Sequence, residues 1–183
     1  MTNIELAFLK ESNRIDRVYV NFALQQAIYA WDYLDHQETL TPSVIKETHR
    51  RLMQGLVKED DLGVFRHQDV YIHGIKAPLI GTIENLVSEW CGLAMTETNE
   101  NSIHYAHVTF EHIHPFFDGN GRVGRMLMLW LRKKAGLDPY IIYKENVREY
   151  YTEFRRKPYP KNKAKELEAE HNENLIILEN SLK

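Results

Sequence analysis

The sequence predicts an all-α fold, mainly helical, that carries one short β-hairpin. Apolar residues recur at helical spacing through most of the chain, whereas the stretch from Val70 to Lys76 alternates in period two and is closed by Pro78. At 183 residues, 43% apolar and 27% charged, the chain suits one compact core. We expect a main domain over residues 1–160 and a charged helix over residues 161–183.

Three helical segments are expected before the hairpin. Residues 3–13 and 17–34 have helical patterns, and Thr41 followed by Pro42 is a typical N-cap and first-turn pair. The third helix should therefore run from this pair to about Leu56. The second presents one apolar face, formed by Leu24, Ile28 and Trp31.

Two further helices are expected to begin at small polar residues after the hairpin. Thr82 should cap the first and Ser102 the second, because each precedes an apolar helical pattern. The first pattern comprises Ile83, Leu86, Val87 and Trp90, and the second comprises Ile103, Ala106, Phe110 and Ile113.

A helix that opens after Gly121 should be the buried centre of the fold. It repeats apolar residues at i, i+3, i+4, i+7 and i+8, and Gly136 should end it. This set is Val123, Met126, Leu127, Trp130 and Leu131. A last helix is expected from Lys144 to about Arg156, before Pro158 and Pro160 interrupt the chain.

Composition argues against several classes of function. A net charge of −3 gives no basic surface for nucleic acid or anionic membranes, and no window approaches the roughly 18 apolar residues of a membrane span. The single cysteine, Cys91, cannot form an internal disulfide, and the charged N-terminus does not fit a signal peptide. We expect a cytoplasmic protein.

The stretch from His114 to Arg125, HPFFDGNGRVGR, concentrates the residues that can do chemistry. Pro115 disfavours helix at His114, so a helix should end there and hold the imidazole at the mouth of a loop. Asp118 then precedes two glycines that let backbone amides converge on an anion, and the next helix points its positive end at the same place. With Arg122 and Arg125, the stretch predicts a phosphate-binding site with a base and a Mg²⁺ ligand.

These residues carry a family resemblance. HPFFDGNGR resembles the signature HPFx(D/E)GNGR of Fic domains at every position from His114 to Arg122, and Arg125 matches the family's second arginine. The resemblance covers about residues 1–160 and implies a helical Fic fold that transfers AMP from ATP to a Ser, Thr or Tyr hydroxyl of a target protein. It implies His114 as the general base and Asp118 as the Mg²⁺ ligand. The implied nucleotide-binding residues are Phe116, Asp118, Gly119, Asn120, Gly121, Arg122 and Arg125.

Two other segments acquire roles from the same resemblance. The hairpin resembles the family's flap, on which a target segment would pair as an added strand. Its residues are Val70, Tyr71, Ile72, His73 and Gly74. Tyr150 and Tyr151 are candidate walls for adenine, although tyrosines at helical spacing are usually core residues.

The segment from Ser12 to Asp16 resembles the inhibitory motif (Ser/Thr)xxxE(Gly/Asn), whose glutamate pairs with the second arginine. Here Asp16 replaces glutamate and Arg17 replaces the small residue, which predicts a weakened brake. A full brake, an ordinary surface helix, and an inhibitor on a separate antitoxin chain remain open. Glu179 with Asn180 is a weaker match to this motif, because Leu175 stands where Ser or Thr is required.

Other interpretations remain beside this one. The enzyme could use another nucleotide or phosphate donor, although Gly121 argues against phosphate transfer, or the chain could be a non-catalytic nucleotide-binding interaction protein. The spacing of His107, Glu111 and His112 does not fit a zinc hydrolase. In the tail, Leu167, His171, Leu175, Leu178 and Leu182 form a stripe that should pack on the domain, on a partner or on a second copy of the chain.

Overall fold

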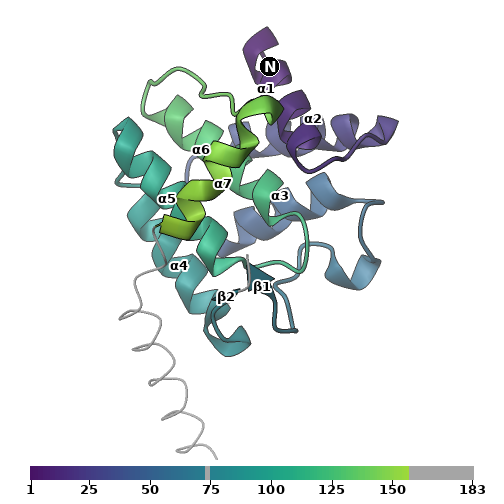
Figure 1. Ribbon diagram of the computed structural model, residues 1–183, viewed down its shortest axis with the longest axis vertical. Coiled ribbons are helices and arrows are strands. Elements are labelled where there is room, and N and C mark those ends of the chain that lie inside the picture. The colour runs from purple at the N-terminus through teal and green to yellow at the C-terminus, as the bar shows by residue number, and fades with distance from the viewer. Residues whose placement is uncertain (73–74, 157–183) are drawn as a thin grey trace, which may run out of the picture.

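The structure is a computed structural model that describes residues 1–72 and 75–156. This part contains seven helices and one two-stranded hairpin, which confirms the predicted fold class; the hairpin lies at the edge of the helical body (Figure 1). The helices are α1 (Asn3–Ile15), α2 (Asn21–Asp35), α3 (Pro42–Met53), α4 (Ile83–Ala94), α5 (Glu100–Ile113), α6 (Asn120–Lys134) and α7 (Val147–Arg156). The predicted charged helix and its stripe lie outside the described residues.

The first three helices begin where local chemistry favours a helix start. Thr2 and Glu5 form a capping box at α1, and the Thr41 side chain accepts from the Val44 amide at the start of α3. The second helix begins at Asn21, four residues later than predicted. Arg17 adopts a left-handed backbone, with φ of 59°, and this conformation ends the preceding helical path.

Two of the predicted caps are wrong in detail. The Thr82 hydroxyl donates to the Leu79 carbonyl instead of accepting from α4, because a 3-10 turn (Ile80–Thr82) leads directly into that helix. Asn99, not Ser102, caps α5, since its side-chain oxygen accepts from the Ser102 amide. The predicted inward faces of both helices are buried.

The sixth helix is the centre of the fold, as predicted. It contacts α1, α2, α3 and α5, and the whole predicted apolar set is buried. Gly136, with φ of 70°, follows its C-cap. Because α6 is enclosed on several sides, its N-terminal end is held firmly at the site described below.

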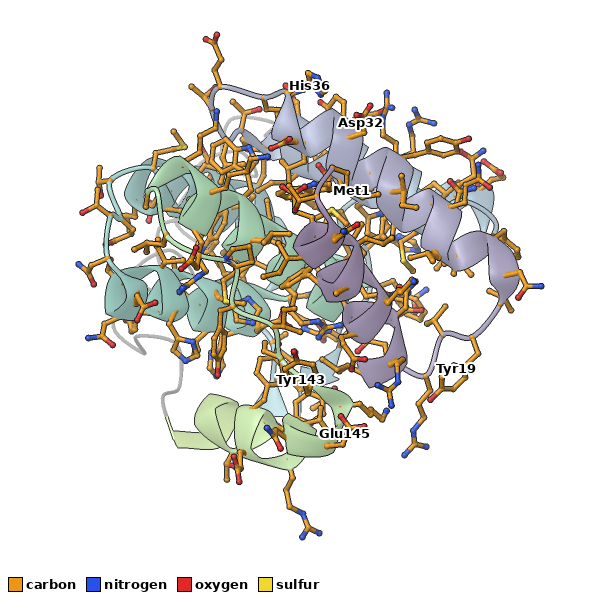
Figure 2. The ribbon with its side chains drawn as sticks, turned by 90° about the horizontal axis from the view of Figure 1, so that it is seen from above. Met1, Tyr19, Asp32, His36, Tyr143 and Glu145 are labelled. Atoms are coloured by element: carbon orange, nitrogen blue, oxygen red, sulfur yellow. The ribbon has the colours of Figure 1, made fainter. Side chains whose placement is uncertain are left out.

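The last described helix packs on α5, while the segment before it reaches α1. A 3-10 turn (Lys144–Asn146) precedes α7. Figure 2 shows Tyr143 and Glu145 between α7 and α1, where the Arg14 guanidinium donates to Glu145 at 3.0 Å. The Lys144 ammonium donates to the carbonyls of Arg14 and Ile15, both at 2.8 Å, and so covers the C-terminal end of α1.

The hairpin is small and regular. Strands β1 (Tyr71–Ile72) and β2 (Ile75–Lys76) are antiparallel, with Tyr71 opposite Lys76. The Ala77 amide donates to the Val70 carbonyl at 3.0 Å, which extends the pairing by one step. The predicted hairpin is thereby confirmed, while His73 and Gly74 lie outside the described residues.

Among the described residues, none of the helices has the length and apolar character that crossing a membrane would require.

Candidate active site

One pocket gathers most of the residues that the sequence singles out. It has a volume of about 280 Å³ and lies where the ends of α1 and α5, the start of α6, the hairpin and α7 meet. The predicted residues that line it are Asp16, Ile72, His114, Asp118, Gly119, Asn120, Gly121, Arg122, Arg125, Tyr150 and Tyr151. Val18, Glu111, His112 and Phe117 complete the lining.

His114 stands at the C-terminal end of α5 in a left-handed conformation, with φ of 49°. Its Nδ1 lies 3.1 Å from the Glu111 carbonyl, which can only accept, so Nδ1 carries the proton and Nε2 keeps a lone pair. Burial lowers the pKa of His114 to about 4. The imidazole is therefore neutral near pH 7, the form that a general base requires.

The loop after His114 is fixed by a side chain from α6. The Asn120 amide group donates to the Phe116 carbonyl and accepts from the Phe116 amide, both at 2.8 Å. The helix begins at Asn120, with Gly119 as its N-cap, and so two positions earlier than predicted. The Asn120 side chain thus donates and accepts within the loop, while Asn120 also lines the pocket; its role toward a phosphate stays a prediction.

Asp118 and Gly119 prepare this loop for an anion and a cation. The Gly119 amide donates to Asp118 Oδ1 at 2.6 Å, and Gly119 has φ of 79°, a conformation that favours glycine. The first turn of α6 presents amide groups that have no partner within the helix. A carboxylate beside helix-terminal amides can serve a Mg²⁺-bound phosphate.

The two arginines of the motif are both buried. Arg122 is 4% exposed, and among the described residues its Nε and Nη1 have no hydrogen-bond partner. Arg125 is 1% exposed and donates to the Ser12 hydroxyl at 2.9 Å, to the Ser12 carbonyl at 3.1 Å and to Asp16 at 2.9 Å. One arginine is thus poised for an anionic ligand, while the other is already engaged.

Asp16 faces both arginines from the end of α1. Its Oδ2 lies 2.9 Å from Arg125 Nη2 and 3.5 Å from Arg122 Nε. Gly121 leaves space for the Arg125 guanidinium in this pair, because a Cβ there would lie 3.0 Å from Arg125 Nη1, whereas its distance of 3.5 Å from Asp16 Oδ2 would be an ordinary contact. The structure therefore brings together Ser12, Asp16 and Arg125 as the resemblance implied.

The two tyrosines of α7 differ in their surroundings. Tyr150 is 7% exposed, and its hydroxyl lies 2.9 Å from His107 Nε2, with the two rings stacked. Tyr151 is half-buried and lies against Tyr150, with ring centroids 5.2 Å apart. Both line the pocket, and Tyr151 offers the more accessible surface to a ligand.

The two phenylalanines of the motif divide their roles. Phe116 is completely buried and stacks on His49 with ring centroids 3.8 Å apart, so its ring holds the loop against the core. Phe116 does not line the pocket, and its role toward a nucleotide stays a prediction. Phe117 does line the pocket and is 51% exposed.

Three functional neighbours were missed by sequence reasoning. His49 Nε2 lies 3.1 Å from the Asp118 carbonyl, Arg66 donates to the His114 carbonyl at 2.9 Å, and Glu111 places a buried carboxyl beside Arg125. Burial raises the pKa of Glu111 to about 8. His49 and Arg66 are 65 and 48 residues from His114 in the chain, and nothing local to them signals this contact.

The sequence model of the Fic/DOC family matches residues 39–131. The chain is 36% identical over 139 residues to the protein adenylyltransferase Fic of Drosophila mojavensis, covering 73% of this chain and 25% of the relative. It is also 36% identical over 123 residues to the protein of that name from Culex quinquefasciatus, covering 64% and 24%. The chain thus spans about a quarter of the length of these curated relatives.

Solved structures share the fold. A Fic domain containing signaling protein from Bacteroides thetaiotaomicron has a TM-score of 0.71 at 16% identity, covering 83% of this chain and 70% of that chain. Fic-1 from C. elegans has a TM-score of 0.69 at 18% identity, covering 99% and 65%. At these identities the likeness concerns the fold alone.

Proposed function

Because this chain belongs to the Fic/DOC family, we propose that it is a protein adenylyltransferase, which transfers AMP from ATP to a hydroxyl of a target protein. The observation that carries the proposal is the pairing of a neutral His114 with the buried, unsatisfied guanidinium nitrogens of Arg122 in one pocket of the described structure. The relatives named protein adenylyltransferase Fic support the same reaction.

The proposed step is an in-line displacement at the α-phosphorus. The hydroxyl oxygen of the target forms a bond to phosphorus while the bond to the bridging oxygen of the β-phosphate breaks, and pyrophosphate leaves with that electron pair. The proton of the hydroxyl passes to His114 Nε2. Arg122, Arg125 and the first amides of α6 stabilise the charge that develops on the pyrophosphate.

We propose Asp118 as the protein ligand of Mg²⁺. Its carboxylate lines the pocket, and a magnesium ion in such a site completes its coordination with nucleotide phosphates and water. When bound, the ion supplies charge neutralisation for the phosphates.

The contact between Asp16 and Arg125 supports a brake. With its guanidinium held by Ser12 and Asp16, Arg125 is not free to bind a γ-phosphate. The Asp16 side chain is 24% exposed, and an ion pair in such a position contributes about 1 kcal/mol. This corresponds to roughly fivefold in a rate, in line with a weak brake.

The target segment is proposed to pair with the hairpin. Ile72 lines the pocket and Tyr71 is 68% exposed beside it, so a strand added at this edge would pass over the pocket near His114. Tyr151 is the proposed wall for adenine. The cytoplasmic setting, an antitoxin and a homodimer remain predictions from the sequence.

The first test asks which phosphate of ATP is transferred to protein. Purified protein is incubated with Mg²⁺, a host lysate and ATP labelled on either the α- or the γ-phosphate, beside His114→Ala and the exposed control His36→Ala. We expect label on protein only from the α position, with His36→Ala and without His114→Ala. Label only from the γ position would instead indicate phosphate transfer.

The brake has its own test in the same assay. Asp16→Gly should raise the rate of AMP transfer about fivefold, whereas Asp60→Gly, at an exposed position, should leave it unchanged. An unchanged rate in Asp16→Gly would remove Asp16 from the mechanism. If both the wild type and Asp16→Gly transfer nothing from ATP, the proposed function is wrong.

A further inference from the structure

Arg66 is a buried cation whose partners are backbone carbonyls. The residue is 2% exposed, and none of the ion pairs found among the described residues includes it. Its Nε donates to the His114 carbonyl at 2.9 Å, Nη1 to the Gln68 carbonyl at 3.2 Å and Nη2 to the Pro78 carbonyl at 2.6 Å. Burial lowers its pKa, the usual sign of a charge withdrawn from water. Three hydrogen bonds to carbonyls compensate the burial of this charge, and the planar guanidinium fixes the relative positions of the three acceptors.

The same residue holds the loop a second time through its backbone. The Arg66 amide donates to the Pro115 carbonyl at 2.8 Å, so two successive carbonyls of the motif are fixed by one residue. His114 is one of only two non-glycine residues with positive φ in the described chain. Such a conformation persists only where its surroundings enforce it, and Arg66 supplies part of that enforcement.

The other two acceptors belong to the legs of the hairpin. Gln68 lies two residues before Val70, and Pro78 directly follows Ala77, whose amide closes the hairpin against the Val70 carbonyl. The three arms of one rigid, planar guanidinium thus join the entry of the hairpin, its exit and the histidine. No hydrogen bond of Arg66 reaches Arg122, Arg125 or the first turn of α6.

We propose that Arg66 is a positioning residue, which sets the separation between the strand-pairing hairpin and His114. The inference rests on the proposed function, since this separation matters only if the hydroxyl of a target segment paired with the hairpin must reach His114 Nε2. It differs from a role in ATP binding, because the hydrogen bonds of Arg66 go to His114, Pro115 and the hairpin and not to Arg122 or Arg125. Substitution should therefore impair transfer to the target while ATP binding is retained.

The test measures ATP binding and transfer to the target separately. Arg66→Lys cannot span three carbonyls, and Arg66→Met contacts none of them; Arg148→Lys on the exposed face of α7 is the matched control. The experiment measures the dissociation constant of Mg²⁺-ATP and the initial rate at which label from the α-phosphate is transferred to lysate protein. In Arg66→Lys the rate should fall about tenfold and in Arg66→Met about 100-fold, with the dissociation constant within about twofold of wild type.

A second readout does not depend on activity. In Arg66→Met, NMR hydrogen exchange should be faster at the amides of Ala77 and Phe116, and unchanged in α4. Unchanged exchange at both amides, or wild-type transfer by Arg66→Lys, overturns the inference. A parallel loss of ATP binding and transfer also overturns it, because the role of Arg66 would then be general support of the site. A wild type that transfers nothing while the exchange result holds refutes the proposed function and leaves the coupling of hairpin and loop established.

Discussion

Asn120 is predicted to be the main side chain that stabilises the catalytic loop from within. Its side chain makes two hydrogen bonds of 2.8 Å to the amide and carbonyl of Phe116, and the residue is 2% exposed. Asn120→Ala removes both partners at once. Because both hydrogen bonds are buried, the Phe116 amide and carbonyl would be left buried and unsatisfied.

The cost follows from these two bonds. Leaving one buried backbone group without a partner costs about 1–3 kcal/mol, and partial entry of water reduces the sum, so we expect a loss of about 3 kcal/mol for the pair. For a chain of 183 residues this corresponds to a fall in Tm of about 6–12 °C. A loss of this size would leave the protein folded at room temperature.

The assay is thermal and urea unfolding followed by circular dichroism, with Asn101→Ala on the exposed face of α5 as the control. Asn120→Asp adds a sharper test, because a protonated aspartic acid can both donate to and accept from Phe116, whereas an ionised one can only accept. Its stability deficit relative to wild type should therefore be smaller at pH 4 than at pH 7. An Asn120→Ala protein that melts within 1 °C (about 0.3–0.5 kcal/mol) of wild type would refute the reasoning.

Three further outcomes are expected. With the His114 pKa lowered to about 4 by burial, kcat/KM should stay level from pH 8 to about 5 and fall below that, and a break near 6.5 would contradict a buried base. Burial raises the Glu111 pKa to about 8, so the contribution of this carboxyl to the free energy of unfolding is fully present below its unfolded pKa of 4.5 and is lost as the pH rises through 8. In urea unfolding, the stability of Glu111→Gln relative to wild type should therefore increase from pH 5 to pH 8, by at most about 1.4 kcal/mol per pH unit. A difference that stays constant with pH would exclude the pKa shift. Gly119→Ala should lower Tm by at least about 4 °C, because its φ is 79° and a Cβ would lie 2.5 Å from Met53 Sδ, whereas Gly92→Ala in open space should not.

Much of the fold could be predicted because its signals are local. The Thr41-Pro42 start, the apolar set of α6 and the period-two stretch of the hairpin each depend on a few adjacent residues, and each was confirmed. The predictions that failed concern the residues at which helices begin. Asn99 outcompeted Ser102 as the cap of α5, and a left-handed Arg17 delayed the start of α2. In both cases the apolar pattern indicated that a helix was present but not the residue at which it begins.

For the site, what could be predicted depends on whether its residues are contiguous in the sequence. The motif from His114 to Arg125 could be located from sequence, since its residues are contiguous and α6 orients them together. The groups that tune it could not, because Arg66, His49 and Glu111 act through backbone carbonyls or burial that exist only after folding.

Asp16 shows why reach cannot be judged from side-chain length alone. One methylene shorter than glutamate, it still lies 2.9 Å from Arg125. Three features outside the side chain make this possible: Gly121 leaves room, Lys144 holds the last carbonyls of α1, and Ser12 fixes the arginine from the other side. The strength of the proposed brake should therefore depend on how α1 packs against α6, and Lys144→Ala should raise the rate of AMP transfer without changing either charged partner.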